Sequence, residues 1–275
     1  MSTTNSTAEK AHAPEPRLAI KDLRVAFGPL VVSQISELSL APAEIVGLAG
    51  ESGSGKSMTA TAILGLAGTV GAKVEGSITL DGLELVGLAE SKLRDLRGRR
   101  IAMIFQSPVG SFNPLFRVGD IFVRALRLHG ARSNAEAKER ASEALREVLL
   151  SPDLLERYPH QLSGGQAQRV AIAQALALRS EILLADEPTS ALDVTVQAEI
   201  LDLLRRLRAE TGISVLFISH DLAVIAELCD RIAVMKSGVI VEQGFARTVL
   251  TDPQDPYTQE LVAAVPHVGG GTVTG

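Results

Sequence analysis

Residues 45–57 of the sequence read IVGLAGESGSGKS. The apolar run Ile45–Ala49 predicts a buried strand, and the residues after Ser57 predict a helix. Between them, Gly50–Ser57 fits the pattern G-x-x-x-x-G-K-S. The glycines let the backbone curl so that successive N–H groups face one point, and the start of a helix favours an anion there. The stretch therefore predicts a phosphate-binding loop in an α/β fold.

The last residues of this loop have separate expected tasks. Lys56 is expected to reach the β- and γ-phosphates of a nucleotide, and Ser57 to ligate Mg²⁺. The alternative is a flexible glycine and serine loop that binds nothing, because the eight-residue pattern also occurs by chance. The residues expected to line the nucleotide are Gly50, Ser52, Gly53, Ser54, Gly55, Lys56, Ser57 and Met58.

A second apolar run ends in two adjacent carboxylates. Ile182–Ala185 predicts a buried strand, and Asp186 and Glu187 follow it directly. Ligands bind at the carboxyl ends of strands in open α/β sheets. Asp186 suits the Mg²⁺ site that accompanies a phosphate-binding loop, and Glu187 could polarise a water for in-line attack on the γ-phosphate. Taken alone the pair is a weak signal, but together with Gly50–Ser57 it predicts a nucleotide-hydrolysing site.

Composition excludes several classes of protein. The chain has 275 residues, with 27 Lys and Arg against 32 Asp and Glu, which gives a formal net charge of −5. Duplex-binding proteins usually carry a basic excess, so nucleic acid is disfavoured. Aromatic side chains make up 3% of the residues and there is no Trp, which disfavours a base-stacking platform. With 46% apolar residues, the chain has enough hydrophobic side chains for a substantial core.

Cysteine content and hydropathy exclude further classes of protein. Cys229 is the single cysteine, so a disulfide framework and a Cys-ligated metal site within this chain are excluded, and a small buried side chain is expected there. No apolar run reaches the 18 to 20 residues of a membrane span. Residues 1–10 lack the apolar core of a secretory signal. We therefore expect a cytosolic protein that depends on another chain for any membrane contact.

Strand and helix patterns alternate along the chain, which predicts an α/β fold with a parallel core sheet. Residues 1–16 and 267–275 are expected to be flexible tails around one domain at 17–266, with a helical subdomain inserted at about 107–180. Within that insertion, Asn134–Leu150 has helical spacing, and Asn134 is expected to cap it. Further strands are expected at Leu18–Phe27, Val31–Leu40, Ser77–Leu80, Ile101–Phe105, Ser214–Ser219, Ile232–Met235 and Val239–Glu242, the last two joined by a Ser237-Gly238 turn.

A third motif decides between families. Leu162–Gln166 reads LSGGQ and precedes a helical run at Gln168–Leu178, which makes a second anion-binding helix start about 20 residues before Asp186. With this motif the sequence resembles the ATP-binding subunits of ABC transporters. The resemblance covers roughly residues 17–266 and implies an α/β P-loop ATPase with an antiparallel N-terminal β subdomain.

The resemblance implies roles for further residues. Gln106 resembles the Q-loop glutamine that contacts Mg²⁺ and water, and His220 resembles the switch histidine at the γ-phosphate. Ser190–Asp193 resembles the D-loop, which places Asp193 beside the nucleotide. Phe27 stands where the family has an aromatic that stacks on adenine, although a buried strand Phe is the alternative. The signature residues Ser163, Gly164, Gly165 and Gln166 are expected to face the nucleotide of a partner subunit.

Finer features resemble the oligopeptide, dipeptide and nickel import branch. They are Ser111–Leu115 after Gln106, Tyr158–Gln161 before the signature, and Asp255–Leu261, which reads DPYTQEL. Asp255 stands where this branch commonly has His, and Ala167 follows the signature where a longer polar residue is usual. Neither departure removes a group that the resemblance makes catalytic.

The resemblance implies an ATP- and Mg²⁺-dependent ATPase at the cytoplasmic face of the membrane. Its partners would be a second ATPase subunit, paralogous or identical, two transmembrane permeases and a substrate-binding lipoprotein, with no nucleic acid. Peptide is the expected cargo, and nickel or a metal chelate is the alternative. A soluble ABC ATPase acting on DNA or ribosomes is the rival class. A basic cluster could serve it or be a solvated face: Lys92, Arg94, Arg97, Arg99 and Arg100.

Overall fold

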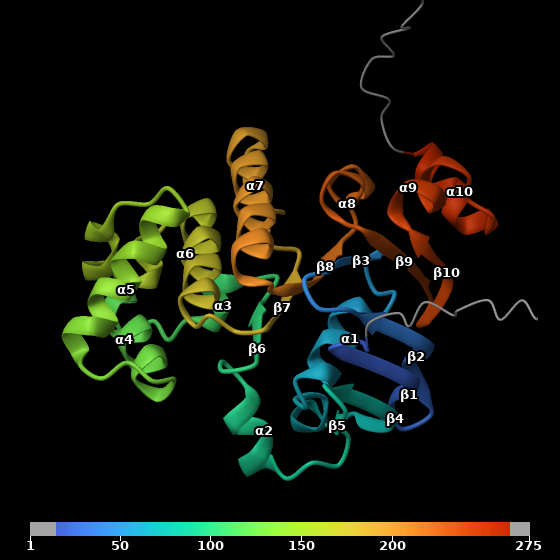
Figure 1. Cartoon of the computed structure of the whole chain (residues 1–275), viewed down its shortest axis with the longest axis horizontal. Helices are drawn as coiled ribbons and strands as arrows, with labels where there is room; N and C mark the ends of the chain where they lie inside the picture. The colour runs from blue at the N-terminus through green and yellow to red at the C-terminus, as the bar shows by residue number, and fades with distance from the viewer. Residues whose placement is uncertain (1–14, 265–275) are drawn as a thin grey trace, which may run out of the picture.

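The computed structural model describes residues 15–264, apart from the side chains of residues 108 and 109. The expected tails, 1–16 and 267–275, lie outside the described residues except for residues 15 and 16. Within the described part, ten strands form one sheet in the order β5-β4-β1-β2-β10-β9-β3-β8-β7-β6 (Figure 1). The strands are β1 (Leu18–Phe27), β2 (Leu30–Leu40), β3 (Ile45–Ala49), β4 (Lys73–Leu80), β5 (Leu83–Glu84), β6 (Ile101–Ile104), β7 (Ile182–Asp186), β8 (Ser214–Ser219), β9 (Arg231–Lys236) and β10 (Val239–Phe245).

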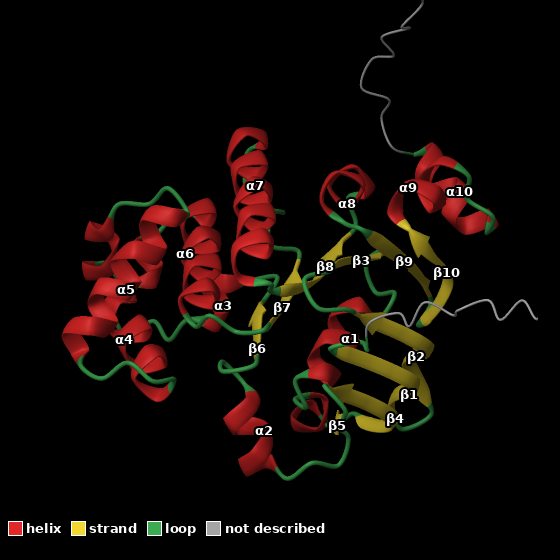
Figure 2. Ribbon diagram, viewed as in Figure 1, coloured by secondary structure: helices red, strands yellow, loops and turns green. Residues whose placement is uncertain are grey.

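Helices lie on both faces of this sheet and beyond its β6 edge (Figure 2). Short 3₁₀ turns occur at Ala67–Val70, Pro152–Glu156 and Pro159–Gln161. No helix in residues 15–264 is long and apolar enough to cross a bilayer. The α-helices are α1 (Lys56–Ile63), α2 (Glu90–Leu96), α3 (Pro108–Ser111), α4 (Val118–Leu128), α5 (Asn134–Glu147), α6 (Gly164–Ala177), α7 (Val194–Thr211), α8 (Leu222–Leu228), α9 (Ala246–Thr251) and α10 (Pro256–Ala263).

The parallel part of the sheet brings the chemically important loops together. Strands β9, β3, β8, β7 and β6 lie side by side and run parallel. Their carboxyl ends therefore lie at one edge, where ligands bind in sheets of this kind. The loop Gly50–Gly55 follows β3, Glu187 follows β7 and His220 follows β8. Sequence-distant motifs thus meet because of the strand order.

Side chains of the parallel strands alternate between two hydrophobic cores. On β8, Val215 and Phe217 belong to one core, and Leu216 and Ile218 to the other. The first core includes residues of α4–α9, whereas the second includes α1 and the strands β1, β2 and β4. Strands buried on both faces are continuous apolar runs, which is why these segments lack a polar alternation.

The antiparallel N-terminal strands extend the same sheet. β1 pairs with β2 and β4, and β4 pairs with β5, all antiparallel. They join the parallel part through β2 and β10, where Val239 pairs with Gln34 and the Gln34 N–H donates to the Gly238 carbonyl at 2.6 Å. The architecture confirms the predicted α/β class with a parallel core and an antiparallel N-terminal part.

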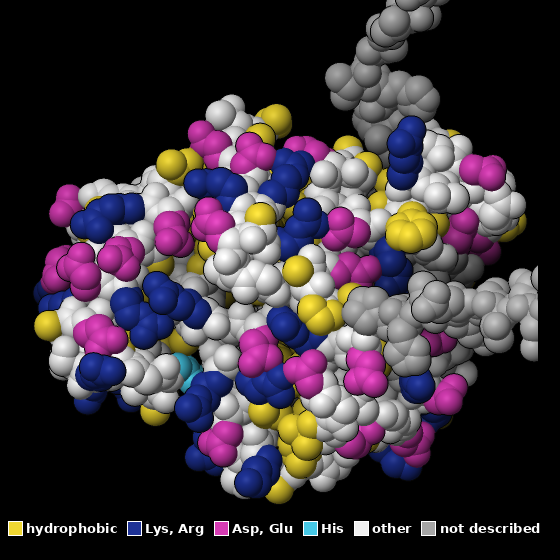
Figure 3. Space-filling model, in the orientation of Figure 1, with side chains coloured by type: hydrophobic (Ala, Val, Ile, Leu, Met, Phe, Trp, Pro, Cys, Tyr) yellow, Lys and Arg dark blue, Asp and Glu magenta, His cyan; other side chains and the backbone are white. Residues whose placement is uncertain are grey.

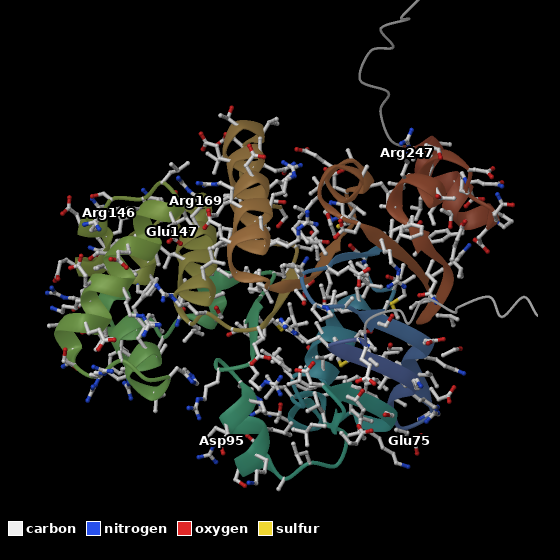
Figure 4. All side chains as sticks on the ribbon, viewed as in Figure 1. Glu75, Asp95, Arg146, Glu147, Arg169 and Arg247 are labelled. Atoms are coloured by element: carbon white, nitrogen blue, oxygen red, sulfur yellow. The ribbon has the colours of Figure 1, made fainter. Side chains whose placement is uncertain are left out.

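Helices α3–α6 lie between β6 and β7 in the chain. Small residues of α5, such as Ala137, Ala141 and Ala144, are buried, which lets α5 pack closely on its neighbours. The Arg169 guanidinium of α6 donates to the Leu149 carbonyl after α5 at 3.3 Å. Figure 4 shows Arg169 near Arg146 and Glu147, the last two residues of α5. Packing and this hydrogen bond thus join α5 to α6.

Several local expectations need correction. Ser133, not Asn134, caps α5, because its hydroxyl accepts the Glu136 N–H at 3.1 Å. The strand expected at Ser77–Leu80 begins at Lys73, and β6 ends at Ile104 rather than Phe105. The Ser237-Gly238 turn is confirmed, with φ of 48° and 88°. Helices α2, α9 and α10 lie in segments where no helix was predicted.

Candidate functional site

The loop after β3 has a shape that only glycine permits at two positions. Gly50 has φ 144°, and a Cβ there would lie 2.1 Å from the Met235 carbonyl oxygen. Gly55 has φ 102°, and a Cβ would lie 2.3 Å from the Val32 carbonyl oxygen. The loop is thus packed directly on the backbones of β2 and β9, which fixes its N–H groups at the start of α1.

Lys56 lies across this loop. Its ammonium donates to the carbonyls of Gly50 and Glu51, each at 2.7 Å, and to the Ser54 hydroxyl at 3.3 Å. Only 5% of the residue is exposed. Burial lowers its pKa, while the nearby carboxylates of Glu187 and Asp186 act in the opposite direction. All three acceptors are neutral groups of the loop. Charged phosphate oxygens could replace them, because they make stronger hydrogen bonds with an ammonium group.

Asp186 ends β7 as a buried carboxylate. Burial raises its pKa, a hydrogen bond with Ser57 lowers it, and the charge of Glu187 raises it. Its Oδ1 atom is buried without a hydrogen-bond partner among the described residues. An orphaned carboxylate oxygen beside a hydroxyl is a fitting partner for a hard cation, and Mg²⁺ takes one or two protein oxygens with phosphates and waters. The predicted Mg²⁺ ligands Ser57 and Asp186 therefore lie together.

Glu187 adopts a strained backbone conformation. Its φ is 50°, in the left-handed region that non-glycine residues rarely occupy. Its N–H donates to the Ile218 carbonyl at 2.9 Å, and its carbonyl accepts the Ser190 hydroxyl at 3.1 Å. These hydrogen bonds keep Glu187 in its strained conformation, and backbone strain is common at functional positions. The conformation sets the direction of the Glu187 side chain, and the residue is 8% exposed.

His220 is paired with this carboxylate. Its Nδ1 lies 2.7 Å from Glu187 Oε1, while most of the imidazole is exposed. The structure brings together Lys56, Ser57, Asp186, Glu187 and His220, the residues for which the sequence predicts roles at a nucleotide site. The hydrogen bond to Nδ1 fixes the ring and leaves Nε2 as its second polar atom.

Gln168 contacts the candidate site, although the sequence predicts no role for it. It is 1% exposed, and its amide Nε2 donates to the Glu187 carbonyl at 3.3 Å. The bond links α6, which carries the LSGGQ motif at its start, to the strained residue after β7. A glutamine on the apolar face of α6 between Ala167 and Val170 was the available signal, because buried amides need partners.

The signature residues lie at the start of α6. The Ser163 hydroxyl accepts the Gln166 N–H at 3.2 Å, and the Gln166 side chain accepts the Ser163 N–H at 3.1 Å. This capping box leaves Ser163 and Gly164 exposed. A Cβ on Gly165 would contact Leu192 at 3.6 Å, so the signature lies against the Ser190–Asp193 segment. Within residues 15–264, no hydrogen bond joins the signature to the phosphate loop.

Within the described residues, the remaining predicted site residues make no hydrogen bond or ion pair with the group formed by Lys56, Asp186, Glu187 and His220. The Asp193 carboxylate caps α7 by accepting the Val196 N–H at 3.0 Å. Gln106 is exposed two residues beyond β6 and makes no hydrogen bond with another described residue. Phe27 and Met58 are half-buried and pack against the second core. Cys229 is buried, as expected, and burial raises its pKa.

A separate cavity of about 630 Å³ opens beside the Gln106 segment. Phe105, Phe112 and Phe116 line it together with residues of α4 and α6. Phe105 and Leu115 in this segment are exposed, large hydrophobic side chains. The groove is therefore partly apolar and lies between the parallel sheet and the helices α4 and α6.

Comparison with known proteins finds relatives of this chain. The sequence matches the ABC transporter family over residues 34–190, more than half of the chain. It is 44% identical over 266 residues to the oligopeptide transport ATP-binding protein OppD of Salmonella typhimurium, covering 93% of this chain and 79% of that protein. It is 45% identical over 260 residues to a putative peptide import ATP-binding protein of Brucella abortus, covering 92% of this chain and 78% of that one.

Another relative is longer, and a solved structure shares the fold. The peptidoglycan transport ATP-binding protein YejF of Agrobacterium fabrum is 48% identical over 260 residues, but the chain spans only 47% of its length. The dimeric bacterial ABC transporter cassette MJ0796 superposes with a TM-score of 0.75 at 32% identity, covering 84% of this chain and 99% of that one. Its post-hydrolysis state with ADP and phosphate superposes equally well. By its motifs, its fold and these relatives, the chain belongs to the ABC transporter family.

Proposed function

We propose that this chain is the ATP-hydrolysing subunit of an importer that takes up peptides through separate permease subunits. The observation that carries the proposal is the convergence of Lys56, Asp186 and the Glu187–His220 pair at one edge of the sheet. The relatives named for peptide and oligopeptide transport support the cargo class. The permease contacts hold the chain at the cytoplasmic face of the membrane.

Binding and hydrolysis follow from the positions of the side chains. The loop N–H groups bind the phosphates, and Lys56 exchanges the Gly50 and Glu51 carbonyls for phosphate oxygens. Glu187 orients and deprotonates the attacking water. His220 steadies the Glu187 carboxylate through Nδ1. To donate Nε2–H to the γ-phosphate as well, the ring would carry a proton on both nitrogens or turn Nδ1 away from Glu187. Catalysis is then mainly positioning plus electrostatic stabilisation.

Mg²⁺ fits the Ser57 and Asp186 pair, with Gln106 as a further oxygen ligand. When bound, the ion neutralises charge on the β- and γ-phosphate oxygens. The raised pKa of Asp186 reflects the cost of a buried carboxylate, which a cation would offset. Asp186 and Ser57 thus form the protein side of the metal site.

A second ATPase subunit completes the site. The exposed signature, with Ser163, Gly164 and Gly165 at a helix start, is available to a nucleotide held by that partner. Ala191 and Leu192 lie next to Gly165, in the segment that the resemblance assigns to the same interface. The dimeric relative supports this arrangement. Burial of two nucleotides between the subunits favours closure, and hydrolysis reopens the dimer.

The groove beside Gln106 is the proposed contact with the permeases. Its apolar lining, with Phe105 exposed and the exposed Leu115 nearby in the chain, suits an amphipathic segment of a membrane subunit. Gln106 lies in the same segment, so a movement of the groove would shift a residue that would help to hold the metal. A substrate-binding lipoprotein delivers the peptide on the other side of the membrane.

The rival class, an ATPase acting on DNA or ribosomes, is less well supported. Figure 3 shows Lys and Arg interspersed with Asp and Glu on the displayed face, without one dominant basic area. In the basic cluster before β6, Arg97 is paired with Glu90, and Arg100 with Asp81 and Glu181. Two of the five basic residues of this cluster are thus paired with carboxylates of the same chain, which favours a solvated face.

The test is Lys56→Ala in the complex isolated through a tag on this chain. Loss of the ammonium removes the main cationic contact with the phosphates, so ATP affinity or turnover should fall severely. Arg247→Ala is the matched control, because this cation is exposed and lies on α9, at the end of the molecule opposite to α4–α6 (Figure 4). Unchanged ATP binding and hydrolysis in Lys56→Ala would contradict the assignment of the loop.

A further inference from the structure

The C-terminal helix α10 touches the phosphate loop. Tyr257 in its first turn is 5% exposed, and its hydroxyl accepts the Glu51 N–H at 3.1 Å. The two residues are 206 positions apart in the chain. Tyr257 belongs to the Asp255–Leu261 segment, which has no role in the proposed hydrolysis. Its contact with the loop indicates that the segment serves the nucleotide site.

The contact fixes one particular peptide group. The Gly50 carbonyl and the Glu51 N–H belong to the same planar peptide unit and point in opposite directions. The carbonyl accepts Lys56 Nζ at 2.7 Å, and the N–H donates to Tyr257 at 3.1 Å. Lys56 and Tyr257 therefore hold this peptide from its two sides. When Lys56 turns towards phosphate, Tyr257 is the remaining side-chain bond on that unit.

Tyr257 is itself held rigidly. The Glu242 carboxylate of β10 accepts the N–H groups of Gln254 at 2.9 Å and Asp255 at 3.1 Å, just before α10. The Asp255 carboxylate caps the helix by accepting the Tyr257 N–H at 2.9 Å. The Lys236 ammonium lies 4.4 Å from the centre of the Tyr257 ring, a cation–π contact.

The same hairpin also holds the phosphate loop. The Gly238 N–H, in the turn between β9 and β10, donates to the Ser54 carbonyl at 2.9 Å. Lys236 and Glu242, which seat α10, lie on the two strands of this hairpin. The loop and the helix are thus fixed to one rigid support, so the tyrosine hydroxyl keeps a constant position relative to the loop.

We propose that Tyr257 is a positioning residue for ATP binding, which holds the Gly50–Glu51 peptide in its binding orientation when Lys56 leaves it. A held loop loses less conformational freedom when ATP binds, so the affinity is higher. Tyr257 does not touch the reacting atoms, so the rate of the bound complex is unaffected. The inference rests on the proposed function, because it assumes that ATP occupies this loop.

The first test is Tyr257→Phe in the isolated complex. The change removes the hydroxyl and keeps the ring under Lys236. A lost hydrogen bond of ordinary strength should raise the KM for ATP about three- to tenfold with less than about a twofold change in kcat. The control is Tyr158→Phe at the chain's other tyrosine, whose ring stacks on His160 before α6. An unchanged KM in Tyr257→Phe, or an equal rise in the control, overturns the proposal.

The second test uses hydrogen exchange and works on the unmodified chain. The Glu51 amide should exchange slowly in the wild-type complex and faster in Tyr257→Phe, while Tyr158→Phe leaves it slow. Fast exchange at Glu51 in the wild type overturns the proposal even if the variant does not fold. Lys56→Ala distinguishes a failure of the proposed function from a failure of the role of Tyr257. Normal ATP binding in Lys56→Ala contradicts the proposed function. Loss of ATP binding in Lys56→Ala, together with an unchanged KM in Tyr257→Phe, contradicts only the role of Tyr257.

Discussion

Glu187 combines a strained backbone, a buried carboxyl group and a histidine partner in one residue. Its φ of 50° is held by bonds to Ile218, Ser190 and Gln168. Such strain is retained where the surroundings fix it for a purpose. The carboxylate is the group best placed to activate water after β7, and its replacement tests that role directly.

Glu187→Gln should keep ATP binding and nearly abolish hydrolysis of the ATP bound at this site. The amide fills the same space but cannot accept a proton, and a positioned base typically contributes about 10²–10⁴-fold. Single-turnover hydrolysis of the ATP bound at this site measures the effect. Glu199→Gln on the exposed surface of α7 is the matched control. Wild-type turnover in Glu187→Gln would remove the base assignment.

Phe27 tests the adenine contact. If its ring stacks on the base, Phe27→Ala should raise the KM for ATP by about fivefold or more, and Phe27→Tyr should restore affinity. The ring is half-buried against the second core, so a purely structural Phe is the alternative. That alternative lowers the melting temperature in Phe27→Ala and leaves the KM unchanged. Titration with ATP and thermal unfolding of the same variants separate the two.

Most of the strands and helices can be predicted from short local sequence patterns. Strands β3, β7 and β8 are continuous apolar runs, and the sequence alone was enough to place them and the loops at their carboxyl ends. The predicted cap of α5 is wrong by one residue, because the Ser133 hydroxyl accepts the Glu136 N–H while the Glu136 carboxylate accepts the Arg132 N–H. Helix α10 and its contact with Glu51 depend on long-range packing, which no local pattern encodes.

The Arg100–Glu181 pair joins β6 to the start of β7. The hydrogen bond from Arg100 lowers the pKa of Glu181. A lowered folded pKa adds stability that is fully present above the unfolded value and is lost as the pH falls through the folded value. Both side chains are partly exposed, so solvent screening limits the contribution to at most about 1 kcal/mol.

Glu181→Gln should therefore lower the free energy of unfolding slightly at pH 7. The difference from the wild type should shrink below about pH 4, where the wild-type carboxylate also becomes protonated. Urea unfolding at the two pH values gives the comparison. Asp202→Asn, in an exposed pair with Arg205 on one helix, is the control and should have a smaller effect. A loss that is independent of pH would contradict the ion-pair explanation.

In the whole molecule, one sheet separates two hydrophobic cores, and the candidate site lies at the carboxyl ends of its parallel strands. The strand order collects the phosphate loop, the carboxylates and the histidine from segments that span residues 50–220. The signature lies on the surface instead, away from the hydrogen bonds of this site. The sequence could predict the motifs and their family, because each is a short contiguous pattern. Their second uses as caps, at Ser163 and Asp193, became visible only in the folded chain.

The proposed function makes this site one half of an ATPase pair that works with membrane partners. The most direct measurement is ATP hydrolysis by the detergent-solubilised complex captured through a tag on this chain, with its subunits identified by mass. We expect two polytopic permeases, a second ATPase and a lipoprotein, and a rate that falls by at least about half in Glu187→Gln, since that base acts in one of two sites. Capture without membrane proteins, or with an unchanged rate in Glu187→Gln, would contradict the account.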